Sequence, residues 1–340
     1  MSSIAWRWRT SAWRTSASLR RLAALLAVLE LVFAGAAFAQ APYPSRPVTM
    51  VVGFAPGGGT DTASRIIAKK LSESLGQPVL VENKAGAGGN IATDQVVKAA
   101  PDGYTILLAS VGSMAITPHM LPKPPYDPLR DLAPITMAVM FPNVLVVHPS
   151  VQANTLADFV ALAKAKPGTL NYGSSGIGNA GHLAGELFRI FAKIDIVHVP
   201  YKGGGPATTD LLGGQIGAIF STPSSVVGHI KAGKIRALAT TGAQRALTMP
   251  EVPTIAESGY PGYEATNWYA YVAPAKTPKE IIARLQQELV KVLSAPDARE
   301  QLLGHGMEPH PGTSEALAKF IEREYATWGR VVREAKITSN

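Results

Sequence analysis

Past Pro44, short apolar runs alternate with amphipathic stretches along the chain. Most of these runs have the length of a β-strand and are followed by a helix signal. Alternation of strands with helices is typical of parallel sheets whose two faces are both covered by helices. The pattern therefore predicts an α/β fold with mostly parallel sheets. The strand candidates are residues 48–55, 78–84, 104–110, 143–149, 169–175, 196–201, 216–222 and 235–242.

Two helix starts are indicated by their capping residues. Thr155 is followed three residues later by Asp158, and Thr277 is followed by Pro278 and then by Glu280. In each case a hydroxyl is placed to cap the helix and an acid lies in the first turn. Beyond the second start, apolar residues recur at helical spacing, which predicts one buried face. These residues are Ile281, Leu285, Leu289 and Val292.

Two stretches interrupt the alternation and indicate where the chain passes between lobes. Residues 122–134 carry too many prolines for regular structure, and residues 257–278 combine glycine, proline and aromatic residues. We expect only helices after the second stretch. We predict that the chain leaves a first lobe near Asn143 and returns near Asn267, so that the terminal helices pack on the first lobe. Lobe 1 then comprises residues 44–142 and 268–340, and lobe 2 comprises residues 143–267.

Composition narrows the classes of function. The chain has no cysteine, which excludes disulfides, thiolate metal sites and a cysteine nucleophile. About 300 residues beyond the N-terminal segment are enough for two domains with large cores. The 32 Lys and Arg residues against 24 Asp and Glu residues give a formal net charge of +8. No run of basic residues with interleaved aromatics marks a nucleic-acid surface, so we expect no nucleic-acid partner.

The first 39 residues have the features of a cleavable signal peptide. Five arginines and no acid precede an apolar run that reaches small residues at Ala37 and Ala39. A membrane span needs about 20 apolar residues, and this run is shorter and is interrupted by Glu30. We predict secretion with cleavage after Ala39, which lowers the formal net charge from +8 to +4. The Arg20-Arg21 pair leaves the twin-arginine export route open, although the flanking residues that would strengthen it are missing.

Three consecutive glycines, residues 57–59, follow the first strand and precede a helix. A loop at the carboxyl end of such a strand is a common place for ligands, and the free N–H groups at a helix start favour an anion. A phosphate is disfavoured, because no lysine follows the glycines and Asp61 would repel a dianion. A carboxylate carries less charge and is tolerated more easily. The alternative is a tight turn in which Thr60 or Asp61 only caps the helix.

Residues 176–181 have the spacing G-x-G-x-x-G between a strand and a helix, as in a dinucleotide fingerprint. The acid about 20 residues further on, Asp195, precedes the next strand and could not reach a ribose. Nicotinamide cofactors are also not expected outside the cytoplasm, so we predict no cofactor. A second loop rich in hydrogen-bond donors is the better interpretation, with Ser174, Ser175 and Asn179 placed to hold a polar end of a ligand.

His182 lies one helical turn before Glu186, and a metal site needs more ligands than this pair. We therefore predict no metal site and a hydrogen-bonded His182. A periplasmic serine hydrolase that uses Ser175 with His182 is the alternative from another class. It lacks an acid to orient the histidine, since Asp61 would have to come from the other lobe.

Three more loops offer polar groups to the cleft expected between the lobes, where small-molecule sites are common. Ser110 ends one strand, Ser221 and Thr222 end another, and Lys202 comes just before a helix. We count these four residues among the predicted ligand contacts. The loops supply hydroxyls, amides and glycines, and almost none supplies a paired acid and base. The sequence therefore predicts a protein that binds a small solute and carries out no reaction.

These loops also carry a family resemblance. The chain resembles the Bug/TctC family of extracytoplasmic solute receptors, the substrate-binding components of tripartite tricarboxylate transporters. The similarity runs from YPSRPVTMVVGFAPGGGTD through VENKAGAGGNIATDQVVKAAPDGYTILLAS, LNYGSSGIGNAGHLAGELF and VHVPYKGGGPATTDLLGGQI to the helical tail. It implies a two-lobe periplasmic binding protein of the type II, Venus-flytrap kind, which closes over one small carboxylate and delivers it to membrane permease subunits. We expect a monomer, and a sensor subunit of a signalling system is a further alternative.

In that family, loops matching GFAPGGGTD and SSGIGNAGH grip the ligand carboxylate, partly through ordered waters. The chain departs from the family pattern at two places near the specificity end of the pocket. Ser221 and Thr222 stand where members usually have Asp and Asn, and Asn179 and Ala180 stand where Thr or Ser is common. The identity of the ligand therefore cannot be carried over. The positions carried over are Phe54, Pro56, Gly57, Gly58, Gly59, Thr60 and Asp61 in lobe 1, and Ser174, Ser175, Gly176, Asn179 and His182 in lobe 2.

Overall fold

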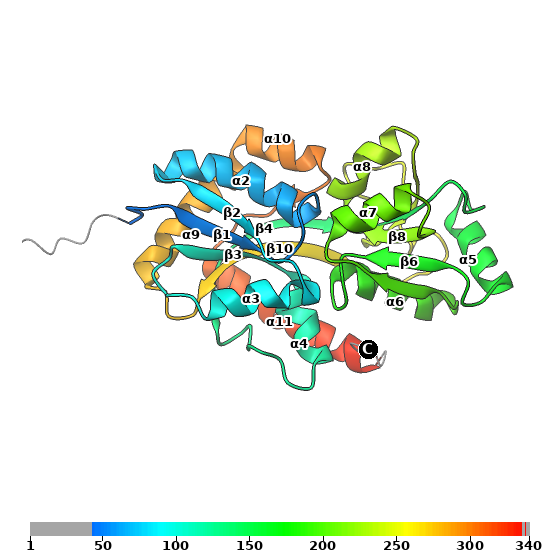
Figure 1. The fold of residues 1–340 in the computed structure, drawn as a ribbon, viewed down its shortest axis with the longest axis horizontal. Helices are drawn as coiled ribbons and strands as arrows, with labels where there is room; N and C mark the ends of the chain where they lie inside the picture. Colours follow the sequence, from blue (N-terminus) through cyan, green and yellow to red (C-terminus); the bar gives the residue numbers. More distant parts are fainter. Residues whose placement is uncertain (1–42, 335–336, 338–340) are drawn as a thin grey trace, which may run out of the picture. The chain divides into compact units, whose positions relative to one another are not determined.

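The computed structural model describes residues 43–334 and residue 337, so the predicted signal peptide, residues 1–39, lies outside the described residues. From Arg46 onward the chain forms one compact unit that holds two β-sheets with helices packed against them (Figure 1). We call the part around the six-stranded sheet lobe 1 and the part around the five-stranded sheet lobe 2. Among the described residues, none of the helices combines the length and hydrophobicity that a membrane span requires.

The six-stranded sheet of lobe 1 has the order β11-β4-β10-β3-β1-β2. β1 pairs in parallel with β2 and β3, whereas β10 runs antiparallel to β3 and β4. All eight predicted strand regions contain a strand, and β4, β10 and β11 come in addition. The strands of this sheet are β1 (Val48–Val52), β2 (Val79–Asn83), β3 (Thr105–Ser110), β4 (Leu132–Pro142), β10 (Thr266–Pro274) and β11 (Glu308–Pro309).

The five-stranded sheet of lobe 2 has the order β7-β6-β8-β5-β9. β6 pairs in parallel with β7 and β8, and β5 runs antiparallel to β8 and β9. The two-lobe α/β fold is confirmed, but both sheets are mixed, whereas the sequence predicted mostly parallel ones. The strands are β5 (Val144–Val147), β6 (Asn171–Ser174), β7 (Val197–Pro200), β8 (Ala218–Ser221) and β9 (Arg236–Thr240).

The mixed sheets follow from the two strands on which the chain passes between the sheets. β4 runs out of lobe 1 directly into β5, with only Asn143 between them. β10 brings the chain back and pairs antiparallel with β4 along its whole length, including Asn267 opposite Phe141. The composition of residues 257–278 predicts an irregular break, and this prediction is wrong for the part that forms β10. The expectation of helices alone after that stretch also misses the two-residue strand β11.

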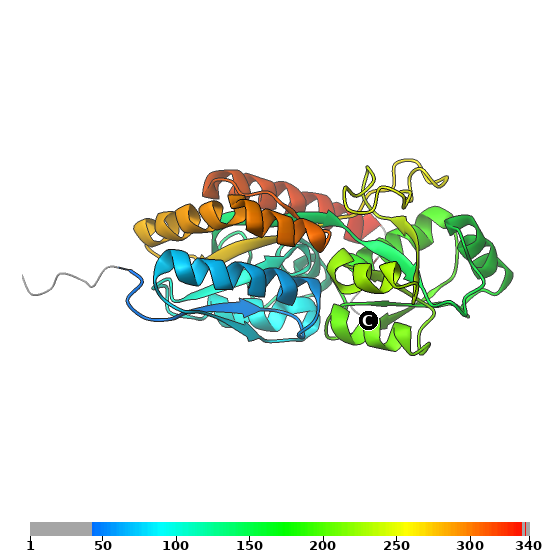
Figure 2. The ribbon, with the colours of Figure 1, turned by 90° about the horizontal axis from the view of Figure 1, so that it is seen from above.

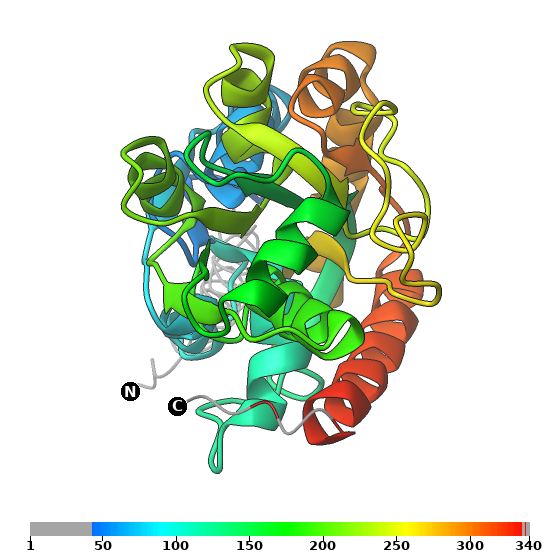
Figure 3. The same cartoon turned by 90° about the vertical axis from the view of Figure 1, so that its right-hand side faces the viewer.

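Alternating side chains of the lobe 2 strands pack on opposite faces of the sheet. Leu145, Val147 and Phe220 join the cluster that contains the buried residues of α5 and α6, whereas Val146 and Ile219 join the cluster of α7 and α8. Figure 3 turns lobe 2 toward the viewer and shows α7 and α8 across the sheet from α5 and α6. These helices are α5 (Leu156–Ala165), α6 (Ala180–Ala192), α7 (Gly204–Leu212) and α8 (Pro223–Lys231).

The two predicted helix caps differ in outcome. Thr155 and Asp158 form a capping box at the start of α5, as predicted. The prediction for Thr277 was wrong, because α9 begins at Lys279 and Pro278 occupies the position before it without a side-chain cap. The remaining helices are α2 (Gly59–Leu75), α3 (Asn90–Val97), α4 (Thr117–Met120), α9 (Lys279–Ser294), α10 (Pro296–Gly304) and α11 (Ser314–Glu334), with short non-α turns at Ala87–Gly89 and Gly112–Ile116.

The C-terminal helices pack against elements of lobe 1. α9 contacts both α2 and β4, and Figure 2 shows α9 and α10 beside α2. α11 is tied to β10, because the indole of Trp268 packs on Phe320 and donates a 2.8 Å hydrogen bond to Glu324. The buried face predicted for α9 is present, because Leu285, Leu289 and Val292 are all buried. The residue boundaries of the two lobes stay a prediction, which these contacts support.

Candidate functional site

A narrow cavity lies where loops of the two lobes meet. It contains about 390 Å³ of space free of protein atoms. The loops that line it stand at the carboxyl ends of β1, β3, β6 and β8, where ligands bind in α/β sheets. The lining residues are Phe54, Gly58, Gly59, Thr60, Ser110, Asn143, Ser175, Asn179, Ala180, Gly181, Gly204, Phe220, Thr222, Asn267 and Tyr269.

The glycine loop between β1 and α2 presents backbone N–H groups to this cavity. Gly58 is the N-cap of α2 and offers no side chain to the first turn, so the N–H groups of that turn stay available. At Gly59 an added Cβ would lie 2.8 Å from both Thr222 Oγ1 and the Tyr269 hydroxyl. A side chain at this position would therefore displace the ends of Thr222, from lobe 2, and of Tyr269, from β10.

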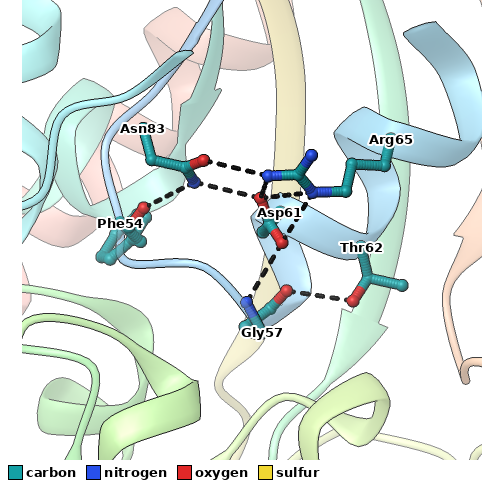
Figure 4. Close-up of polar contacts among 7 residues, drawn as sticks. Phe54, Gly57, Asp61, Thr62, Arg65 and Asn83 are labelled. Carbon is teal, nitrogen blue, oxygen red and sulfur yellow. Dashed lines mark hydrogen bonds and ion pairs between the residues drawn. The ribbon is translucent and has the colours of Figure 1, made fainter. Parts of the chain in front are cut away.

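Asp61 contacts the glycine loop but does not line the cavity. Figure 4 shows its polar contacts. Its carboxylate accepts hydrogen bonds from Gly57 N at 3.1 Å, from Asn83 Nδ2 at 3.1 Å and from Arg65 Nε at 3.0 Å. The Asn83 amide also donates to the Phe54 carbonyl at 2.9 Å, which fixes the end of β1. Burial opposes ionisation, but these hydrogen bonds and the charge of Arg65 outweigh it and lower the pKa of Asp61. Both carboxylate oxygens are thus used by the protein, which disfavours ligand contact. Asp61 is not the cap expected from the sequence, because the N-cap of α2 is Gly58 and no side chain caps this helix; Asp61 instead lies in the first turn and holds the loop before it.

The loop between β6 and α6 forms the opposing side of the cavity. Asn179 is the N-cap of α6 and accepts a 3.0 Å hydrogen bond from His182 N. Gly178 N donates to His182 Nδ1 at 3.1 Å, and Gly176 N donates to Ser174 Oγ at 3.2 Å. Side chains behind the loop therefore set its backbone, while Ser175, Asn179 and the start of α6 face the cavity.

A stacked pair of buried histidines supports this loop. The rings of His182 and His198 lie 4.1 Å apart, and His198 Nε2 lies 2.7 Å from Ser174 Oγ. Burial lowers the pKa of His182, against the opposing charge of Glu186. Burial, with a smaller effect of His182, lowers the pKa of His198 to about 3. Both rings are therefore neutral near pH 7 and act as hydrogen-bonding and packing groups.

Half of the sixteen predicted ligand contacts line the cavity. The eight that do are Phe54, Gly58, Gly59, Thr60, Ser110, Ser175, Asn179 and Thr222. Lys202 is exposed. Its backbone carbonyl links the two lobes, because it accepts a 2.9 Å hydrogen bond from Ala55 N. The other predicted contacts that do not line the cavity are Pro56, Gly57, Asp61, Ser174, Gly176, His182 and Ser221.

Sequence reasoning missed several lining residues, and the missed strands account for two of them. Asn267 and Tyr269 lie on β10, which was not predicted, and Asn143 was noted only as a crossing point. A polar residue at each predicted crossing was a usable signal, because crossings border the cleft. The other missed residues are Ala180, Gly181, Gly204 and Phe220.

The electrostatics of the cavity come from helix ends. None of the lining residues carries a charged side chain, and the N-termini of α2, α6, α7 and α8 all contribute to the lining. Such ends bear a partial positive charge and free N–H groups, a combination that binds anions, although α8 begins with Pro223, which has no N–H to offer. Within the described part of the chain, no cluster of three or more His, Asp or Glu residues could hold a metal ion.

A family model, a relative in sequence and two solved structures each match most of this chain. The model of the tripartite tricarboxylate transporter family receptor, TctC, matches residues 63–337. Protein BugT of Bordetella pertussis is 41% identical over 316 residues, covering 91% of this chain and 97% of BugT. A solved R. palustris protein with adipate has a TM-score of 0.85 and 36% identity, over 87% of this chain and 99% of that one. MatC from Rhodopseudomonas palustris with bound malate has a TM-score of 0.82 and 32% identity, over 85% and 100%.

Proposed function

Because the chain belongs to the TctC family of tripartite tricarboxylate transporter receptors, we propose that it captures a small carboxylate in the interlobe cavity and delivers it to the membrane permease of such a transporter. In this proposal the protein acts in the periplasm as a monomer, after removal of residues 1–39. The solved relatives that contain adipate and malate support a carboxylate as the solute.

The observation that carries the proposal is a cavity that attracts anions without any charged side chain. Four helix N-termini supply partial positive charge and N–H donors to one small space. A carboxylate accepts several such hydrogen bonds at once. A cationic ligand would find no carboxylate among the lining residues.

The contacts between the lobes support a cycle of opening and closure. Two glycine-rich loops, residues 57–59 and 203–205, touch across the cleft, and Ala55 N donates to Lys202 O at its mouth. These contacts lie at the mouth of the cavity, so a solute enters before they form. Closure then buries the solute, and the permease responds to the closed form.

The hydrolase alternative is disfavoured by the same geometry. Ser174, the serine next to a histidine ring, is 1% exposed and does not line the cavity. His182 uses Nδ1 to accept from Gly178 N, so this nitrogen is not available to Ser175. A nucleophile needs a base within hydrogen-bond reach and access to substrate.

Thermal unfolding with a panel of acids tests the proposal. At a hundredfold excess over the dissociation constant, a ligand adds about 2.7 kcal/mol of stability, which raises the Tm of a protein of this size by roughly 4 °C. We expect di- and tricarboxylates, aromatic acids and amino acids to include at least one such stabiliser. The neutral amides of the same acids are the matched controls. If the amides raise the Tm and the acids do not, the proposal is wrong.

A further inference from the structure

Two asparagines at the interlobe crossings meet inside the cavity. Asn143 and Asn267 are 1% and 5% exposed, and Asn267 Nδ2 donates to Asn143 Oδ1 at 3.3 Å. The position of Asn143 is fixed by Thr241, whose hydroxyl accepts from Asn143 N at 2.8 Å and whose N–H donates to the Asn143 carbonyl at 2.9 Å. Asn267 is fixed by its place in β10. The two side chains therefore form a preorganised pair.

This pair presents one unused donor and one unused acceptor. Asn143 Nδ2 and Asn267 Oδ1 are buried and have no hydrogen-bond partner within the described part of the chain. Turning both amides together would exchange the roles of the four atoms and would again leave one donor and one acceptor. Ser110 Oγ, also buried and unpartnered among the described residues, lines the same cavity.

Buried polar groups in folded proteins have hydrogen-bond partners, and because this pair lines the cavity, a bound solute is placed to supply them. A carboxylate only accepts and an ammonium only donates, whereas a hydroxyl group does both. An ammonium would also lack a counter-charge, because Asp61, the acid nearest in sequence to the lining, is occupied by Gly57, Asn83 and Arg65. The pair therefore matches an uncharged hydroxyl group.

Resting on the proposed function, we propose that the solute is a hydroxy acid. Its carboxylate binds at the helix N-termini, where Asn179 Nδ2 is another buried and unpartnered donor in the described chain. Its hydroxyl group donates to one amide of the Asn143–Asn267 pair and accepts from the other. The pocket then rejects the corresponding amino acid, which places an ammonium where the hydroxyl group belongs.

Matched acids that differ in one substituent test this assignment. We would measure dissociation constants by calorimetry for succinate, malate and aspartate, and for glutarate, 2-hydroxyglutarate and glutamate. Adipate with its 2-hydroxy and 2-amino derivatives, and benzoate with its 3-hydroxy and 3-aminomethyl derivatives, complete the set. In at least one series, we expect the hydroxy acid to bind at least tenfold more tightly than the unsubstituted acid and a hundredfold more tightly than the amine.

The outcomes separate the two proposals. If unsubstituted acids bind as tightly as hydroxy acids in every series, or if the amines bind best, the hydroxyl assignment fails while the carboxylate function stands. If no member of any series binds, both proposals fail.

Variants locate the hydroxyl group. Asn267→Asp adds a carboxylate to the pair, and we expect it to raise the affinity ratio of amino acid to hydroxy acid at least tenfold. Gln301→Glu, an equal charge change at an exposed position of α10, is the control and leaves the ratio unchanged. Asn267→Leu, without the charge, is the second variant and should remove the preference for the hydroxyl group. Unchanged ratios in both Asn267 variants would overturn the assignment.

Discussion

Individual residues at this site act mainly by holding backbone in place. Asp61 does not line the cavity, yet it binds the loop residue Gly57, the neighbouring strand through Asn83 and the helix residue Arg65 at once. His182 and His198 do the same for the opposite loop. The residues that look most reactive in the sequence are therefore positioning residues, and their substitution should change stability more than ligand choice.

Replacement of Asp61 tests this distinction. Asp61→Asn removes the ion pair with Arg65 and leaves one oxygen for three donors. We expect the free energy of unfolding to fall by about 1–3 kcal/mol, since a buried charged hydrogen bond is lost. The affinity for a bound acid should change less than threefold. Chemical denaturation and calorimetry measure the two quantities.

Asp94→Asn is the matched control for Asp61→Asn. It breaks the ion pair between Asp94 and Lys98, which has the same i,i+4 spacing as the Asp61–Arg65 pair but is more exposed. We expect the free energy of unfolding to fall by less than about 0.5 kcal/mol. A large loss of affinity in Asp61→Asn without loss of stability would instead place Asp61 in contact with the ligand.

The histidine pair predicts the pH dependence of stability. Both rings are neutral in the folded protein, so below pH 6.5, the usual pKa of histidine, the unfolded chain binds protons that the folded chain does not. The free energy of unfolding should fall as the pH drops from about 6.5 toward the pKa of His198, about 3. The slope is at most about 1.4 kcal/mol per pH unit for each histidine.

Urea unfolding between pH 7.5 and 4.5 measures this slope. His198→Gln keeps a polar group near Ser174 and does not titrate, so its stability should vary less with pH than that of the native protein. A slope in His198→Gln equal to that of the native protein would contradict the prediction.

At the scale of elements, the closed arrangement depends on facing glycine loops. A Cβ added at Gly205 would lie 2.7 Å from the Pro56 carbonyl across the cleft, and backbone atoms cannot give way cheaply. Gly205→Ala should therefore impede closure and weaken binding of the acid at least tenfold. The ligand-free Tm should hold or rise, because alanine favours the helix α7. Gly228→Ala in α8, where an added Cβ meets nothing within 4 Å, is the control. Native affinity in Gly205→Ala would refute this role for the loops.

The elements also show how much of the fold the local sequence pattern predicts. The eight predicted strand regions all contain strands, because each carries its own apolar run between turn residues. β4 and β10 were missed since one follows a proline-rich segment and the other lies in a stretch rich in Gly and Pro. The lining loops near Gly59 and Ser175 were predictable from strand ends. Asn267 and Tyr269 were not, because only the pairing of β10 with its neighbours brings them to the cavity.

At the scale of the whole molecule, the chain folds without disulfides, because it has no cysteine. We expect the mature protein to begin at Gln40. Intact mass spectrometry of protein from the periplasmic fraction checks this, and Ala39→Pro, placed at the predicted cleavage site, should leave the precursor uncut. A mature protein that begins elsewhere would show that the signal peptide has different bounds.

The placement of helix ends around the cavity has a consequence for how such receptors diversify. In the proposed complex, the groups that hold the carboxylate are main-chain amides, which every amino acid except proline supplies. Point mutations that keep the fold and the geometry of the glycine loops therefore leave these main-chain donors in place, while the side chains around them can change. Selection can thus retarget the receptor from one acid to another through residues such as Asn143 and Asn267, while the capacity to bind an acid is inherited with the fold itself.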